Sequence, residues 1–306
     1  MKVLITGGLG YLGGELVSLL NQNSLISKIY VYDKGVFGLA HFAGLMSPKT
    51  ELVIGDILDR ANLEAVVKNV DTVIHLASLV GAPLVDRKPH ESYEVNIKGS
   101  ELLSSLLRGD QRLLFASTGS CYGRVEGICD ENSSISPLSS YGRHKAEGEE
   151  IFTNNNTINL RFATVYGLSF RTRNDLYINN MMKKAVYDKS VVLYQGDAKR
   201  TFIHVHDAAR AIELLISKSN ITHKTYNVGD DSLGLSKRNI CDMISSKTDF
   251  NIVSDEFAKD PDQRDYVVDY GRLYGEGFKP VMDLNRQLDV LKNYYFSMFS
   301  AGYENG

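Results

Sequence analysis

The stretch Lys2-Val3-Leu4-Ile5-Thr6-Gly7-Gly8-Leu9-Gly10-Tyr11-Leu12-Gly13-Gly14 joins an apolar run to a cluster of glycines. Val3 to Ile5 suit a buried parallel strand, and leucines at helical spacing follow the glycines, so the glycines lie where a strand passes into a helix. In such a turn Gly7 permits the tight bend, Gly10 lets the backbone approach a pyrophosphate, and Gly13 lets helix and strand pack closely. The pyrophosphate then lies at the positive end of the helix dipole. The stretch predicts a dinucleotide-binding turn, with a merely flexible glycine loop as the alternative.

An acidic residue at the expected distance supports the dinucleotide. Asp33 ends a second apolar run, Ile29 to Tyr32, and lies twenty residues beyond Gly13. A carboxylate there accepts hydrogen bonds from an adenosine ribose and repels a 2′-phosphate, which favours NAD over NADP. Asp56, which follows a third apolar run, is a candidate acceptor for the adenine amine; capping of the next helix is the alternative role.

Composition excludes several classes of protein. The net charge of −3 over 306 residues argues against a general nucleic-acid or membrane-surface binder. The three cysteines, Cys121, Cys129 and Cys241, have no metal-like spacing and leave one thiol unpaired, which favours a reducing compartment and no metal site. The chain starts directly with a strand, and no run approaches the ~20 apolar residues of a membrane span. We therefore expect a cytoplasmic protein without signal peptide or membrane segment.

Strands alternate with helices along most of the chain, which predicts an α/β fold: a Rossmann-type doubly wound parallel sheet with a smaller α+β substrate-binding lobe. Residues 1–165 are expected to form the nucleotide-binding domain, to which 196–220 return. Residues 166–195 and 221–306 are expected to form the smaller lobe, which then includes the apolar segment Tyr226 to Val228.

Three polar residues form the strongest chemical pattern. Tyr141 and Lys145 are four residues apart on a predicted helix, so their side chains face the same way. A close ammonium favours the phenolate and makes a tyrosine a useful base near neutral pH. Thr118 lies at the carboxyl end of a predicted strand, where open α/β sheets bind ligands, and can orient the same substrate oxygen. The alternative for the Tyr–Lys pair is an exposed helix face.

With these residues in order, the chain resembles the extended short-chain dehydrogenase/reductases that act on nucleotide sugars, the epimerase/dehydratase group. The resemblance covers nearly the whole chain. It rests on Thr6–Gly13, His75–Ser78, Asn96–Gly99, Ser117–Thr118 with Tyr122–Gly123, Tyr141–Lys145, Arg161–Gly167 and Arg200–Val205.

The resemblance implies roles for individual residues. Tyr141 would be the catalytic acid or base, Lys145 would bind the nicotinamide ribose and tune Tyr141, and Thr118 would be the hydroxyl partner. The implied NAD-binding residues are Gly7, Gly10, Tyr11, Leu12, Asp33, Asp56, Ile57, Ala77, Ser78, Tyr141, Lys145 and Phe162. The implied residues for a nucleotide-diphosphate sugar are Ser120, Arg200 and Arg264, with a surface ion pair as the alternative for Arg264. Asn96 is expected to be structural or to fix backbone near the cofactor, and a homo-oligomer is the family expectation.

Departures from the family pattern reduce the number of reactions that the chain is expected to catalyse. Gly119 and Ser120 stand where the 4,6-dehydratases have an Asp-Glu pair, so dehydration lacks its acid and base. Ser120 also stands where some 3,5-epimerases have a cysteine, and Cys121 is one residue out of place. Hydride transfer at sugar C4 remains, most simply in a 4-epimerase. A GDP-sugar 4-dehydrogenase or 4-ketoreductase is the alternative, because Leu79–Leu84 and Asp260–Tyr266 are similar to a subgroup containing GDP-heptose 4-dehydrogenases. A non-catalytic NAD(H)-binding protein on the same fold is the third reading.

Overall fold

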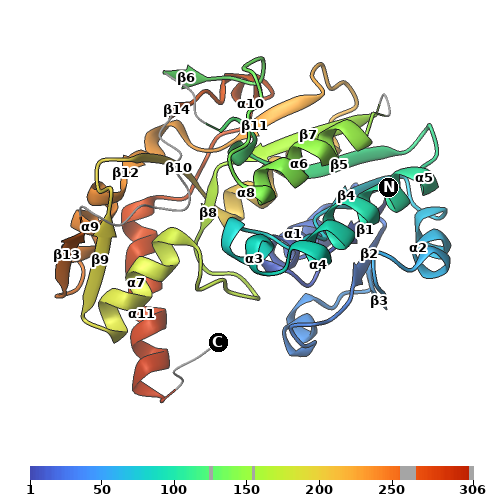
Figure 1. The fold of residues 1–306 in the computed structure, drawn as a ribbon. Coiled ribbons are helices and arrows are strands. Elements are labelled where there is room, and N and C mark those ends of the chain that lie inside the picture. The colour runs from blue at the N-terminus through green and yellow to red at the C-terminus, as the bar shows by residue number, and fades with distance from the viewer. Residues whose placement is uncertain (124–126, 154–155, 256–266, 303–306) are drawn as a thin grey trace.

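The computed structural model describes residues 1–123, 127–153, 156–255 and 267–302 (Figure 1). Its centre is a seven-stranded sheet in the order β11-β7-β5-β4-β1-β2-β3. The bounds are β1 (Lys2–Thr6), β2 (Lys28–Asp33), β3 (Thr50–Ile54), β4 (Thr72–His75), β5 (Arg112–Thr118), β7 (Thr157–Phe162) and β11 (Thr225–Val228). Every neighbouring pair in it is parallel. The predicted Rossmann-type sheet is therefore confirmed.

Helices cover both faces of this sheet, because successive side chains of a buried strand point to opposite faces. On one face Val3 and Ile5 pack with Leu16 of α1 (Tyr11–Gln22) and Ile212 of α8 (Val205–Ser217). On the other face Leu4 belongs to a second cluster of buried apolar side chains, which three helices cover. These are α2 (Arg60–Val67), α5 (Gly99–Leu106) and α6 (Ser140–Ile151). The sheet is thus doubly wound, as expected.

Three short helical segments lie between β4 and α5. They are α3 (Ala82–Arg87), α4 (Pro89–Tyr93) and a π-helical turn, η2 (Glu94–Lys98), which leads directly into α5. Two 3₁₀ turns, η1 (Ala40–Leu45) and η3 (Gly119–Cys121), follow β2 and β5. Among the described residues, no helix is long and apolar enough to cross a membrane.

A smaller lobe has its own core. Two small sheets, β12-β10-β8 and β13-β9, pack with helices around Tyr166, Met182, Phe202 and Leu288. Its strands are β8 (Thr164–Tyr166), β9 (Ser190–Tyr194), β10 (Lys199–His204), β12 (Gly234–Ser236) and β13 (Asn251–Asp255). Its helices are α7 (Tyr177–Tyr187), η4 (Asp231–Leu233), α9 (Lys237–Ser245) and α11 (Leu284–Ser300). In Figure 1 this lobe lies to one side of the large sheet, with α7 and α11 packed together.

The structure corrects the expected lobe boundaries at two places. The segment Tyr226 to Val228, placed in the smaller lobe from the sequence, forms β11 at the edge of the large sheet, where Tyr226 and Val228 are fully buried. Within 196–220, expected to return to the larger domain, α8 packs against α1, but β10 pairs with β8 and β12 in the smaller lobe. The apolar residues of a short strand predict that it is buried. They do not predict which sheet it joins, because that depends on segments distant in sequence.

Candidate active site

The glycine turn lies between β1 and α1, at the point where the strand order of the sheet reverses. Gly7 has a φ of +72°, and a Cβ there would lie 2.7 Å from the backbone nitrogen of Ala77. A Cβ at Gly13 would lie 2.5 Å from the Gly7 carbonyl oxygen. Gly10 caps α1 without a side chain, so the first amides of the helix face the crevice beyond the strands. This cradle fits a dinucleotide pyrophosphate.

Asp33 lies beside this turn at the end of β2. Its two carboxylate oxygens accept hydrogen bonds from the backbone N–H groups of Leu9, at 3.1 Å, and Gly35, at 2.9 Å. These bonds hold the carboxylate next to the turn and leave acceptor capacity on both oxygens, since each has two lone pairs. The position suits an adenosine ribose, so the residues present fit NAD.

Asp56 follows β3 and already has protein partners. Lys34 Nζ lies 2.8 Å from Asp56 Oδ2, and the backbone N–H of Leu58 donates to Oδ1 at 3.0 Å. Burial alone would raise the pKa of the Asp56 carboxyl, but the hydrogen bonds from Lys34 and Leu58 hold it below its usual value. Its neighbour Ile57 is buried and packs against Gly99. A role of Asp56 toward adenine stays a prediction.

Two neighbouring residues of the turn differ in where their side chains lie. The Tyr11 side chain is buried, and its hydroxyl donates to the Gly167 carbonyl at 2.9 Å. Tyr11 is therefore available to a cofactor through its backbone, while its ring ties the turn to the loop after β8. Leu12 is half-buried and packs against the core of the α1 face.

The loop after β4 carries Ala77 and Ser78. The side chain of Asn96, in the π-helical turn η2, accepts hydrogen bonds from Ser78 Oγ at 2.9 Å and Leu79 N at 2.8 Å, and donates to the Leu79 carbonyl at 3.0 Å. Asn96 thus fixes this backbone beside the glycine turn, which confirms the expected structural role.

The structure places Tyr141 and Lys145 on α6, against the end of β5. A Cβ at Gly142, next to Tyr141, would lie 2.9 Å from the Ser120 carbonyl oxygen, so the start of α6 touches η3. Thr118 Oγ1 accepts from the backbone N–H of Ser120 and donates to Ser120 Oγ, both at 3.2 Å. Phe162 pairs with Thr118 on the neighbouring strand, so the implied nicotinamide-side residues share one edge of the sheet.

Lys145 is almost completely buried, with 4% of its surface exposed, and its Nζ lies 4.9 Å from the centre of the Phe115 ring. Burial lowers the pKa of its ammonium to about 8. Burial also lowers the pKa of His75, in the neighbouring strand β4, to about 3, and the Lys145 charge acts in the same direction. His75 is therefore neutral near neutral pH, whereas Lys145, one helical turn after Tyr141 on α6, is largely protonated there.

A buried polar network supports this helix, and its role is not evident from the sequence. Arg161 pairs with Glu149 of α6 at 2.7 Å and donates to the Tyr122 hydroxyl at 3.1 Å. Tyr122 in turn donates to Asn227 Oδ1 at 2.6 Å. Glu149 lies four residues beyond Lys145, a spacing that could have drawn attention to it.

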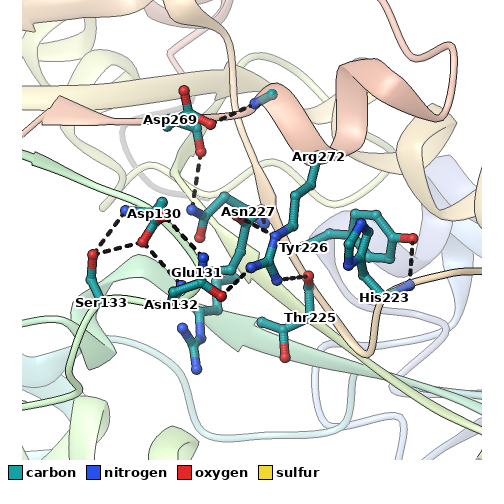
Figure 2. Close-up of polar contacts among 12 residues, drawn as sticks. Asp130, Glu131, Asn132, Ser133, His223, Thr225, Tyr226, Asn227, Asp269 and Arg272 are labelled. Carbon is teal, nitrogen blue, oxygen red and sulfur yellow. Dashed lines mark hydrogen bonds and ion pairs between the residues drawn. The ribbon is translucent and has the colours of Figure 1, made fainter.

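The network continues through β11 to the next segment of the chain (Figure 2). The Asn227 backbone N–H donates to Glu131 Oε1 at 2.7 Å, and its side-chain amide donates to the Asp269 carbonyl at 3.0 Å. Arg272 of α10 (Gly271–Gly275) lies 3.3 Å from Glu131 Oε2. These contacts attach the short parallel pair β6 (Ile128–Cys129) and β14 (Val267–Val268) to the large sheet.

Arg173, in the loop after β8, is a further residue that sequence reasoning missed. One of its terminal nitrogens lies within 3.8 Å of a Cβ built on Gly81, in the loop after β4, and another contact, at 2.5 Å, joins it to Asp175. Burial acts to lower the pKa of Arg173, but Asp175 and the nearby hydroxyls of Tyr141 and Tyr11 raise it above its usual value. The charged run Arg171-Thr172-Arg173 was the available signal.

The implied diphosphate ligands lie in the smaller lobe or beyond the described residues. Arg200 is buried on β10, and its Nη1 donates to the Lys199 carbonyl at 3.1 Å. Arg264 falls outside the described residues, so its role stays a prediction. Among the residues that the structure describes, no group of three His, Cys, Asp or Glu side chains is arranged to hold a metal ion.

Comparison with known proteins agrees with this geometry. The chain is 30% identical over 244 residues to an uncharacterised UDP-glucose epimerase of Bacillus subtilis, covering 75% of this chain and 77% of the relative. It is 27% identical to a UDP-glucose 4-epimerase of Yersinia enterocolitica, covering 85% and 87%. The UDP-glucose 4-epimerase of Thermus thermophilus, solved in complex with NAD, has the same fold, with a TM-score of 0.84, 22% identity and coverage of 96% and 99%. The model of the NAD dependent epimerase/dehydratase family matches residues 3–229, so the chain belongs to this family and its cofactor is NAD.

Proposed function

We propose that this protein is an NAD-dependent nucleotide-sugar 4-epimerase. The observation that carries the proposal is the position of Tyr141 and the buried Lys145, one helical turn apart on α6, against the end of β5 that bears Thr118. The names of the relatives favour a UDP-sugar as substrate.

Each residue has a distinct role in the proposed reaction. The glycine turn and Asp33 would hold NAD, which when bound would supply the hydride acceptor and donor that inversion at sugar C4 needs. Tyr141 takes the proton of the C4 hydroxyl and later gives it back, acting as general base and then as general acid. Lys145 favours the phenolate by its charge, and Thr118, supported by Ser120, orients the C4 oxygen by a hydrogen bond.

We propose that the smaller lobe binds the nucleotide diphosphate, with Arg200 and Arg264 as its cationic ligands. Guanidinium groups suit phosphate oxygens because they donate two parallel hydrogen bonds. Holding the diphosphate while leaving the sugar free to turn is what C4 inversion requires, since the hydride must reach both faces of C4.

The experiment is to incubate the purified protein with UDP-, GDP-, dTDP- and CDP-sugars, without added cofactor, and to follow the C4 proton by NMR. Catalytic conversion of one sugar into its C4 epimer is expected. A 4-keto product in stoichiometric amount, becoming catalytic only with an added acceptor, would instead make the enzyme a 4-dehydrogenase.

A pair of variants separates catalysis from a purely NAD-binding role. Tyr141→Phe is expected to lower kcat by about 10²- to 10⁴-fold, the usual contribution of general acid–base catalysis. Tyr194→Phe, at a half-exposed tyrosine of the smaller lobe, is the matched control and should retain activity. Full activity in Tyr141→Phe would exclude the proposed catalytic role.

We further propose a homodimer that acts in the reducing cytoplasm, in carbohydrate or polysaccharide biosynthesis. The dimer would pair the helices around Glu94–Leu107 and Tyr141–Phe152 of the two subunits, as the family expectation has it. The buried free thiols Cys121, Cys129 and Cys241 are compatible with a reducing compartment. Light scattering at micromolar concentration tests the dimer, and a monomer would exclude it.

A further inference from the structure

The segment Leu168–Arg173, called here the strap, leaves β8 of the smaller lobe and runs over the nucleotide-binding lobe. Ser169 Oγ donates to the Tyr11 carbonyl at 2.6 Å, and the Tyr11 hydroxyl donates to the Gly167 carbonyl at 2.9 Å. The strap is therefore attached at the N-terminus of α1, where the pyrophosphate of NAD is expected.

Phe170 extends this attachment to the adenosine side of the site. A Cβ added at Gly14 of α1 would lie 3.1 Å from Phe170 Cβ, and one at Gly44 of η1 would lie 3.4 Å from the Phe170 ring. Phe170 of the strap thus packs between α1 and η1. Two glycines leave the space that the ring occupies.

Arg171 of the strap contacts the loop that follows β2. Its guanidinium carbon lies 3.2 Å from the centre of the Phe37 ring, in the loop just after Asp33. The Asp33 carboxylate is near enough to interact electrostatically with Arg171. Phe37 keeps 62% of its surface exposed, so the core does not account for an aromatic residue there. A guanidinium over an aromatic face is a cation–π contact, stronger when both partners are partly desolvated.

We propose that Arg171 and Phe37 form a clasp that closes the strap over the adenosine end of the NAD site and holds the cofactor in place. The ribose expected at Asp33 and the pyrophosphate expected at Gly10 both lie beside the strap's contacts, so the strap and the loop after β2 border the adenosine end of the site. This inference deepens the proposed function, because a 4-epimerase must retain one cofactor molecule through each turnover.

The experiment measures NAD release from the purified holoprotein, without sugar, by dilution into an enzyme that consumes free NAD. Arg171→Ala and Phe37→Ala are each expected to speed release about three- to fivefold, the value of a cation–π contact whose aromatic partner is largely exposed. The double variant should release NAD no faster than either single one, because both remove the same contact. Arg171→Lys should fall between, and Arg286→Ala, at an exposed arginine of α11, should match the wild type.

Release within twofold of the wild type in Arg171→Ala would overturn the clasp. Acceleration by Arg171→Ala with no effect of Phe37→Ala would also overturn it, since the arginine would then act by charge alone. Unchanged thermal unfolding of the variants checks that they fold. No sugar is present, so failure of the clasp leaves the proposed epimerase activity standing, and failure of the NMR assay leaves the clasp standing.

Discussion

Arg161 of β7 and Glu149 of α6, the helix that carries Tyr141 and Lys145, form a buried ion pair between that helix and the large sheet. The Nη2–Oε2 distance is 2.7 Å, with 6% and 8% of the two side chains exposed. Ser117 Oγ donates to the same carboxylate at 2.5 Å, so the pair joins α6 to β5 and β7. Neither group can be removed without leaving a charge in a poorly solvated place.

The first prediction concerns this pair. Glu149→Gln keeps the volume but leaves the Arg161 charge unpaired, so we expect a loss of about 3–5 kcal/mol in the free energy of unfolding. Glu91→Gln breaks the exposed Lys88–Glu91 pair and should cost less than about 1 kcal/mol. Urea denaturation of both variants tests this. Equal losses in the two would show that the buried pair contributes no more than a surface one.

Much of the fold was predictable because its signals are local. Apolar strands, helical leucine spacing and the glycine turn lie within short windows of sequence, and they led to the parallel sheet. The lobe to which Tyr226–Val228 belongs was not predictable in this way. That strand joins β7 only because the chain returns to the sheet after the smaller lobe has begun.

The residues of the candidate site also differ in whether a local sequence signal identifies them. Tyr141 and Lys145 are linked by helical spacing and Thr118 by a strand end, so one window each was enough to select them. Arg173 lies beside Gly81 and the strap residue Arg171 contacts Phe37, and these partners are distant in sequence. From the sequence alone, a charged run after a strand is equally typical of a functional loop and of a solvated one.

The second prediction concerns the pH dependence of stability. The pKa of Lys145 is about 8 in the native state and 10.5 in the reference state, so between these values the unfolded chain binds more protons. Stability from this group therefore rises as the pH rises. Relative to Lys145→Met, the wild type should gain about 2–3 kcal/mol in unfolding free energy from pH 7 to pH 10. A parallel pH dependence of wild type and variant in urea denaturation would contradict it.

The third prediction concerns the choice of cofactor. Asp33→Asn removes the charge expected to face the adenosine ribose but keeps the side-chain shape. NAD should bind about tenfold more weakly, the value of one charge-assisted hydrogen bond, while NADP, no longer repelled, should bind better relative to NAD. Calorimetric titration with each cofactor measures both changes, and Asp86→Asn, at an exposed aspartate of α3, is the control. An unchanged NAD/NADP affinity ratio would remove Asp33 from the cofactor site.

The fourth prediction concerns Arg173, whose guanidinium lies beside the loop of Gly81 and interacts electrostatically with Tyr141. A cation at this place stabilises negative charge that develops on the phenolate or on the substrate oxygen. Arg173→Met should therefore lower kcat/KM about tenfold, corresponding to about 1.4 kcal/mol of transition-state stabilisation, and move the acidic limb of the kcat–pH profile to higher pH.

The same assay applied to two further variants shows whether charge is the cause. Arg173→Lys keeps the cation and should restore most of the pH profile even if the shorter reach of the ammonium costs some affinity. Arg143→Met, at an exposed arginine two residues after Tyr141, should leave the profile unchanged. If Arg173→Met raised KM alone and left the pH limb where it is, Arg173 would be a substrate-binding group without influence on the proton transfer. That separation is measurable because kcat reports the bound complex, whereas kcat/KM also includes the binding step.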